Sequence, residues 1–362
     1  MQLIRSIDSS ALPARGCALT IGNFDAVHIG HRRILRDLTA RAKQRHLPAV
    51  VMTFDPHPQE FFARARADAA PPPRLTTTAA RFFALRDCGV DIMLSLRFNR
   101  ALAQTSAEDF VRRHLVERLK IRHLLIGDDF RFGARRGGDF QLLETMAGAG
   151  DYTLERVPAI EHGGARVSSS RIRELLAGGD LAAAELLLGR RYAHVGRVRR
   201  GKQRGRAWGF PTINLAVRHR PALRGIFAVT VRGLSGAPLP GVASLGNRPT
   251  LRDSGTVLEV HLFDYPCDGE AYGRRVCVEF VARIRDEKKF DSYAELIERI
   301  GEDAAVARRL LGVGDGDSGR GDGDGDGDGV GDGVGDSAGD GDGAGAGDGA
   351  GDSAGDGDGA GA

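Results

Sequence analysis

The stretch IGNFDAVHIGH, residues 21–31, decides the fold of the first half of this chain. It follows an apolar run, and apolar residues at 34, 35, 38 and 42 come after it at helical spacing. A strand is therefore predicted to end in a tight turn that brings His28, Gly30 and His31 to the N-terminus of a helix. Free backbone N–H groups and the helix dipole favour anions there, and Gly30 lets the backbone approach a phosphate closely.

The same turn contains Gly22, Asn23 and Phe24, which we expect to contact the phosphates of a nucleotide. Two alternatives stay open for the histidines, a metal site and an ordinary solvated surface. No Cys, Asp or Glu completes a local zinc ligand set, which argues against the metal.

Strands and helices alternate through the first half of the sequence. Strand-like runs occupy about 17–22, 48–54, 90–96, 123–127 and 152–160, with amphipathic helical segments between them. This order predicts an α/β domain with a doubly wound parallel sheet covered by helices on both faces. IGNFDAVHIGH, TFDPHP and IGDDFRFG each follow a strand, so all three should meet at one sheet edge, where such folds bind ligands.

The second half changes to short strands separated by Gly- and Pro-rich turns. Six of them, ending near residue 284, predict a six-stranded antiparallel β-barrel, and a helix follows at about 292–311. We therefore expect three parts: the α/β domain at 1–188, the barrel domain at 189–312 and a tail at 313–362.

Charge is divided unevenly along the 362 residues. The tail has 14 Asp and one Arg, whereas the remainder has 50 Lys and Arg against 34 Asp and Glu, a net charge of +16. A Gly-Asp tail without apolar periodicity predicts disorder, and it lacks the regular large apolar position of a calcium-binding repeat. A basic body suits phosphate-rich ligands, including nucleic acid.

Four cysteines lie far apart in the sequence, at positions 17, 88, 267 and 277. Their scatter without a CxxC pair, and the absence of a signal-like or membrane-spanning apolar run, predict a cytoplasmic protein that does not contact a membrane.

Two further polar segments belong to the first half. VSSSRIRELL places Ser169, Ser170 and Arg171 at the start of a helix, with Arg173 as a further positive charge, to form a second anion site or a plain serine-rich N-cap. IGDDFRFG places Asp128 and Asp129 after a strand, where they could hold Mg²⁺ or the ribose of a ligand, or form a charged surface turn.

GNFDAVHIGH, TFDPHPQEFF, IGDDFRFGARRGGD and VSSSRIR, in this order, resemble the FMN adenylyltransferase module of bacterial bifunctional FAD synthetases, over roughly residues 15–188. The resemblance implies that the ATP phosphates are held by two motifs, His28, Gly30 and His31 in one and Ser169, Ser170 and Arg171 in the other. Ala26 stands where the family usually has Gly, and Ser170 where it usually has Thr.

A glycine-rich segment, GRVRRGKQRGRAWGFPTINL, opens the second half. Its first glycines and Lys202 approach P-loop spacing, but Gln203 replaces the Ser or Thr of that motif, and no helix is predicted to follow. We expect instead a phosphate flap that contains Gly201 and Gly205.

Two strands of the predicted barrel carry polar residues of interest. Thr212 and Asn214 are two apart on a strand and so share a face, where their oxygens could hold the Mg²⁺ of ATP, although a Pro-Thr-x-Asn sequence is also common at a strand entry. Glu259, in TVLEVHLFDY, is a candidate general base or a solvated strand residue.

GRAWGFPTIN, GIFAV, GVASLGNRPT, LEVHLFDY and RDEKKFDS resemble, in order, the riboflavin kinase module of the same family, from about residue 189 to 311. The resemblance implies that Thr212 and Asn214 bind Mg-ATP and that Glu259 is the base for the 5′-hydroxyl of riboflavin. Trp208 and Ile213 replace the commoner Leu and Ala.

The predicted function is therefore two reactions: ATP and riboflavin give FMN, and ATP and FMN give FAD and pyrophosphate. Riboflavin, FMN and ATP are the expected small-molecule partners, with Mg²⁺ at both sites and no nucleic acid. Two alternatives stay open: an adenylyltransferase for another phosphate ester, and a catalytically inactive regulator that binds flavin or nucleic acid.

Overall fold

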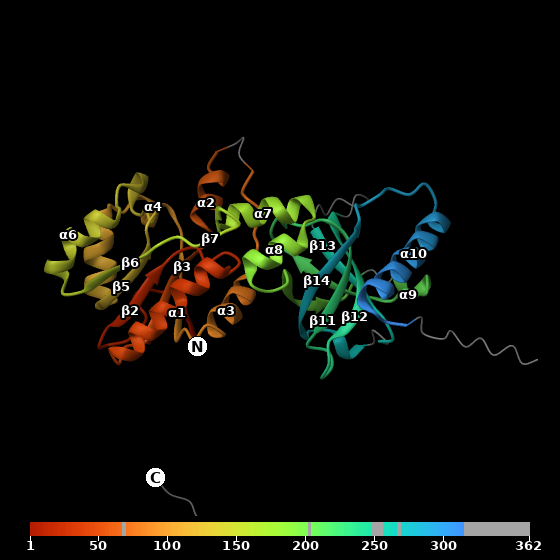
Figure 1. The fold of residues 1–362 in the computed structure, drawn as a ribbon, viewed down its shortest axis with the longest axis horizontal. Coiled ribbons are helices and arrows are strands. Elements are labelled where there is room, and N and C mark those ends of the chain that lie inside the picture. Colours follow the sequence, from red (N-terminus) through yellow and green to blue (C-terminus); the bar gives the residue numbers. More distant parts are fainter. Residues whose placement is uncertain (67–69, 202–203, 248–255, 266–268, 315–362) are drawn as a thin grey trace, which may run out of the picture. The chain divides into compact units, whose positions relative to one another are not determined.

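The computed structural model describes residues 1–66, 70–201, 204–247, 256–265 and 269–314. Its first half is built on a six-stranded sheet in the order β1-β4-β3-β2-β5-β6, in which every neighbouring pair is parallel (Figure 1). The strands are β1 (Gln2–Ile4), β2 (Cys17–Ile21), β3 (Ala49–Asp55), β4 (Ile92–Arg97), β5 (Ile121–Gly127) and β6 (Thr153–Val157). The predicted doubly wound α/β domain is confirmed.

Helices cover both faces of this sheet because successive strand side chains point to opposite sides. On one face, Ala18 and Val51 pack against α1 (Ile29–Gln44) and α3 (Thr78–Arg86). On the other, Leu19 and Met52 pack against the π-helix η1 (Phe110–Arg118) and α6 (Phe140–Gly150). Figure 1 shows α1 and α3 on the opposite side of the strands from α6. Three short helices complete this half: α2 (Pro58–Arg64), α4 (Arg100–Gln104) and α5 (Ala107–Asp109).

The strand order reverses at β2. From β2 the chain adds β3 and β4 on one side, whereas β5 and β6 lie on the other. The loops that leave the carboxyl ends of β2 and β5 therefore lie side by side at the switch point, where open α/β sheets bind ligands. These loops carry the turn at residues 22–28 and the segment that begins at Asp128.

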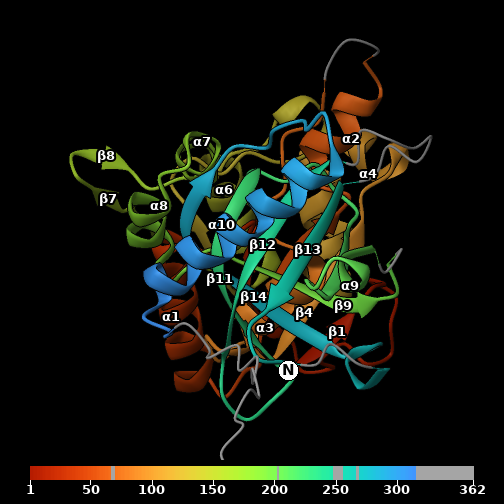
Figure 2. The same cartoon turned by 90° about the vertical axis from the view of Figure 1, so that its right-hand side faces the viewer.

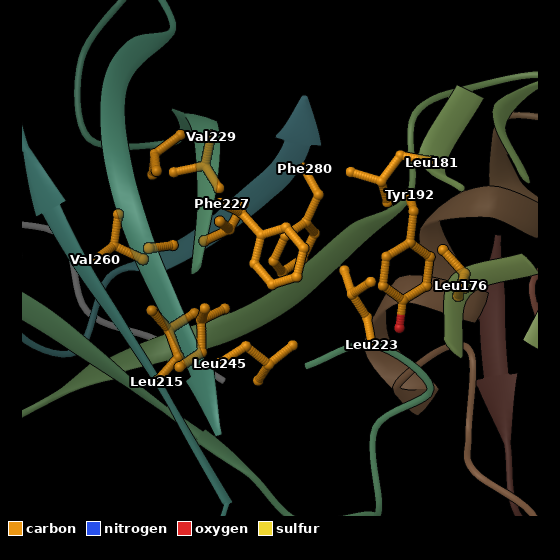
Figure 3. Close-up of a cluster of buried hydrophobic side chains, with 14 of the residues drawn as sticks. Leu176, Leu181, Tyr192, Leu215, Leu223, Phe227, Val229, Leu245, Val260 and Phe280 are labelled. Atoms are coloured by element: carbon orange, nitrogen blue, oxygen red, sulfur yellow. The ribbon is translucent and has the colours of Figure 1, made fainter. Parts of the chain in front are cut away.

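The second half is a closed antiparallel barrel in the order β10-β13-β12-β11-β14-β9, as predicted. Phe227 and Phe280 meet edge to face inside it, with ring centroids 5.2 Å apart (Figure 3). Its strands are β9 (Ala193–Arg199), β10 (Thr212–Val217), β11 (Gly225–Arg232), β12 (Leu239–Asn247), β13 (Thr256–Leu262) and β14 (Arg275–Arg285). The helix α10 (Tyr293–Leu311) packs on the outside of β11 and β12 (Figure 2). Its contacts include Ala304 and Ala307.

Two helices link the halves, α7 (Ser169–Gly178) and α8 (Leu181–Leu188). Leu176, Leu181 and Tyr192 belong to the same apolar cluster as the barrel interior, and Figure 3 shows them beside Leu223. The helices that we assigned to the first domain thus share a core with the second. The predicted tail lies outside the described residues from position 315, as does Cys267.

Several short elements were not predicted from the sequence. The edge strand β1 and the hairpin of β7 (Glu161–His162) and β8 (Ala165–Arg166) are too short to show a period. Two single-turn 3-10 helices, η2 (Ala134–Arg136) and η3 (Gly269–Ala271), are equally short. The expectation that no helix follows Gln203 was wrong, because a four-residue helix, α9 (Arg204–Ala207), forms there. No helix in the described ranges has both the length and the apolar character needed to cross a bilayer.

Candidate active sites

The first site is the turn between β2 and α1. His28 is the N-cap of α1, and its Nδ1 accepts a hydrogen bond from the backbone N–H of His31 at 3.3 Å. The two imidazoles stack with their centroids 3.6 Å apart, so one helix turn places both rings together. Gly30 allows this arrangement, because a Cβ there would lie 3.2 Å from the His28 ring.

Both imidazoles are held neutral. Burial lowers the pKa of His28 to about 4, against the opposing effect of the Asp25 carboxylate. Burial, together with His28 and Arg81, lowers the pKa of His31 well below its usual range. Because Nδ1 of His28 accepts a hydrogen bond, the proton of the neutral ring is on Nε2, which can donate to an anion.

The backbone of this turn is left-handed at three residues that are not glycine. Phe24, Ala26 and Val27 have φ values of 47°, 81° and 46°. Ala26 is the position at which the family resemblance led us to expect Gly. Its methyl group is buried at a φ that L-residues avoid, so surrounding contacts must hold the turn in place.

Asp25, which is 1 % exposed, supplies much of that support. Its carboxylate accepts hydrogen bonds from the N–H groups of Leu75 and Thr76, at 3.1 and 3.0 Å, and pairs with Arg173 at 2.7 Å. The Ser169 hydroxyl donates to its backbone carbonyl at 2.9 Å. Burial alone would raise the pKa of Asp25, but the charges of His57, Arg81 and Arg173 outweigh that effect and lower it.

A buried cation lies behind the turn. Arg81 is 1 % exposed and donates to the Thr53 hydroxyl at 2.8 Å and to Nε2 of His57 at 2.6 Å. Thr53 in turn donates to the carbonyl of Asn23 at 3.2 Å. Within the described ranges, Arg81 forms no ion pair with a carboxylate. It lies in the field of the Asp25 carboxylate without a direct ion pair, and it adds positive charge near the site, which favours an anionic ligand.

Three other residues predicted to bind phosphate in this half lie in different surroundings. Phe24 is buried in the core, 4.9 Å from His31 between ring centroids, so its side chain supports the turn. Ser170 is exposed, and the Arg171 guanidinium donates to the carbonyls of His162 and Ala165, in the β7–β8 hairpin.

The two acidic residues after β5 are also exposed. Asp129 pairs with Arg166 at 2.7 Å, which lowers the pKa of the Asp129 carboxyl. This pair joins the loop after β5 to the hairpin, and it occupies the carboxylate that we considered for Mg²⁺ or ribose.

The second site lies on the outer face of the barrel. Ile213 and Leu215 of β10 point into the core, so Thr212 and Asn214 face outward, as the two-residue spacing predicts. In the antiparallel register, Asn214 lies directly opposite Glu259 of β13. Strand pairing thus brings together two residues that are 45 positions apart in the sequence.

Glycines fit closely around this pair. The Asn214 Nδ2 lies 3.4 Å from the Thr212 hydroxyl, and a Cβ at Gly201 would come within 2.5 Å of the Asn214 amide. A Cβ at Gly205 would collide with the carbonyl of Phe210, whose N–H donates to the Gly205 carbonyl at 2.8 Å. The predicted flap therefore folds against the Thr-x-Asn strand, although residues 202–203 lie outside the described residues.

A doubly wound domain with paired histidines at its switch point, joined to a barrel with this polar face, fits a two-module nucleotide-dependent transferase. Family models agree with the division. Residues 11–171 match the FAD synthetase family, and residues 188–311 match the riboflavin kinase family.

Proteins that are similar over most of this chain identify the family more closely. The bifunctional riboflavin kinase/FMN adenylyltransferase of Escherichia coli K12 is 43 % identical over 315 residues, which cover 86 % of this chain and 99 % of the relative. The corresponding protein of Pseudomonas fluorescens is 42 % identical, with 86 % and 98 % covered. A crystal structure described as a macrolide-efflux protein from Streptococcus pneumoniae has a TM-score of 0.68 at 28 % identity and covers 84 % of this chain and 98 % of its own.

The chain belongs to the family of bifunctional riboflavin kinase/FMN adenylyltransferases.

Proposed function

We propose that the barrel site phosphorylates riboflavin with ATP and that the switch-point site adenylylates the resulting FMN to FAD. The register of Asn214 opposite Glu259 carries the first half of this proposal, because it places a carboxylate beside oxygen ligands suited to Mg-ATP. The paired neutral histidines at a helix N-terminus support the second half.

In the kinase reaction, Glu259 acts as the general base. It removes the proton of the riboflavin 5′-hydroxyl as that oxygen attacks the γ-phosphate of ATP, and ADP leaves. Glu259 of β13 is half-buried on the same outer face of the barrel sheet as Thr212 and Asn214 of the neighbouring β10. This position keeps the base and the nucleotide ligands on one side of the barrel wall.

Mg²⁺ fits the donor set of this site. Thr212 and Asn214 offer a hydroxyl and an amide oxygen, which are hard ligands, and Mg²⁺ in ATP sites takes most of its other ligands from phosphate and water. We propose that these two residues hold the ion, which neutralises phosphate charge when bound. No group of three or more His, Cys, Asp or Glu that could form an all-protein cage occurs in the described part of the chain.

In the adenylyl transfer, a phosphate oxygen of FMN attacks the α-phosphate of ATP and pyrophosphate leaves. His28 donates from Nε2 to a phosphate oxygen, and His31 lies beside it as a second neutral imidazole. The N-terminus of α1 and the buried charge of Arg81 favour the anionic transition state. No covalent intermediate is required, because positioning and charge stabilisation suffice for this reaction.

Chromatography of flavins tests both reactions. Wild-type protein with riboflavin, ATP and Mg²⁺ should form FMN and then FAD. Glu259→Gln should form no FMN from riboflavin but should convert supplied FMN to FAD, and Glu279→Gln, on another barrel strand, should behave as wild type. Absence of any flavin product from wild-type protein would overturn the proposal, and FMN without FAD would overturn its second half.

The described cysteines, Cys17, Cys88 and Cys277, are free thiols. Free thiols persist in a reducing compartment. We therefore propose that the protein acts in the cytoplasm on small-molecule substrates.

A further inference from the structure

The left-handed turn at residues 24–27 needs external support, and part of it comes from beyond α8. The Arg190 guanidinium donates to the carbonyls of Ala26 and Val27, at 2.5 and 3.2 Å, and to the carbonyl of Leu188 at 3.4 Å. Ala26 and Val27 have positive φ values and directly precede the N-cap His28. Arg190 thus fixes the peptide units that set the direction of α1.

Arg190 has no competing role in the described part of the chain. It forms no ion pair with a carboxylate there, and its hydrogen bonds go to the turn and to its own segment. The adjacent Arg191, by contrast, is exposed and lies 4.0 Å from Glu185. One arginine therefore faces the turn and the next faces the surface.

The segment that carries Arg190 fits closely against the start of α1. Gly189 has a φ of 69°, and a Cβ on it would lie 2.9 Å from the side chain of Ile29, the first residue of α1. Leu188 and Tyr192 lie in the same apolar cluster as Ala26. The connection between the halves is thus part of the packing around the turn.

The barrel supports the turn by a second route. The N–H of Arg74 donates to the carbonyl of Arg220 at 3.0 Å, and the Thr77 hydroxyl donates to the carbonyl of Val195 at 3.2 Å. Between them, Leu75 and Thr76 donate to Asp25. Barrel backbone therefore braces the segment that holds the turn's carboxylate.

We propose that Arg190 is a positioning residue for adenylyl transfer and that the connection to the barrel is a working part of that site. The inference rests on the proposed function of the switch-point site. Arg190 acts through the carbonyls of Ala26 and Val27, which place His28 and His31 for the ATP phosphates. Loss of the guanidinium should leave the barrel reaction intact.

The test uses the full-length protein with Arg190→Ala, Arg190→Lys and the matched control Arg191→Ala. Both half-reactions are measured in each preparation, with separate kcat and KM values for ATP. Arg190→Ala should lower kcat/KM for FMN adenylylation by about 10- to 100-fold, the effect expected of a small displacement of reacting groups. Riboflavin phosphorylation should stay within about twofold, Arg190→Lys should be intermediate, and Arg191→Ala should match wild type.

A double-mutant cycle with Ala26→Gly separates positioning from charge. Glycine adopts a positive φ freely, so the turn should depend less on Arg190 in that background, and the loss caused by Arg190→Ala should shrink at least about threefold. An equal loss in both backgrounds, unchanged adenylylation in Arg190→Ala, or loss of both reactions would overturn the inference. If wild-type protein itself formed FMN but no FAD, the proposed function of the site would be the part that failed.

Discussion

Removal of the Arg173 side chain should destabilise the turn that carries His28 and His31. Arg173→Ala leaves the Asp25 carboxylate, 1 % exposed, without its ion-pair partner. Breaking a buried ion pair typically costs about 3–5 kcal/mol. Asp25 keeps the N–H groups of Leu75 and Thr76, so we expect the lower end, about 3 kcal/mol.

Urea unfolding followed by circular dichroism measures this loss. With a slope of about 2 kcal/mol per M, the midpoint should fall by roughly 1–2 M. Arg112→Ala, which breaks an exposed pair with Asp109, serves as the surface control and should shift stability by less than about 1 kcal/mol. FMN adenylylation should fall in Arg173→Ala, whereas riboflavin phosphorylation should not.

The loss of stability in Arg173→Ala should also depend on pH. In the wild type the lowered pKa of Asp25 gives stability that is present above the unfolded value and is lost as pH falls through the folded value. Without Arg173 the pKa of Asp25 should rise, because one of the charges that lowers it is gone, so the loss of stability should shrink as the pH falls and Asp25 takes up a proton. A wild-type midpoint for Arg173→Ala, or a deficit that does not change with pH, would refute this reasoning.

Three further outcomes are expected. Burial lowers the pKa of His28 to about 4, whereas the unfolded imidazole titrates near 6.5. The free energy of unfolding should therefore fall by up to about 3 kcal/mol as the pH drops from 6.5 to 4. His28→Asn should flatten this pH profile. Gly201→Ala should raise KM for ATP in riboflavin phosphorylation without changing FMN adenylylation, since its Cβ would press on the Asn214 amide. Chelation of Mg²⁺ with EDTA should stop both reactions, and added Mg²⁺ should restore them; activity that persists in EDTA would contradict the proposed role of Thr212.

Much of the fold follows from local periodicity. The strands around the switch point are apolar runs with polar residues directly after them, and their alternation with helices predicted the sheet. The pattern could not show that residues 110–118 form a π-helix, because that geometry depends on hydrogen-bond partners rather than on which residues are apolar.

The local geometry of both candidate sites was predictable where it depends on residues close together in the sequence. The histidine turn and the Thr-x-Asn strand each lie within a few residues, and the structure forms both as expected. Asp25 was missed because its partners are 50 and 148 residues away. The family motif matched Arg171, but the side-chain directions on α7 show that Arg173 reaches the turn.

Two separate sites should carry the two reactions, and mixing two single-site variants tests this directly. Glu259→Gln should convert supplied FMN to FAD but not use riboflavin, and the double variant His28→Ala, His31→Ala should stop at FMN. Neither alone should make FAD from riboflavin, whereas an equal mixture with ATP and Mg²⁺ should do so through released FMN. If either variant, shown to be folded, lost both half-reactions, the two-site account would be wrong.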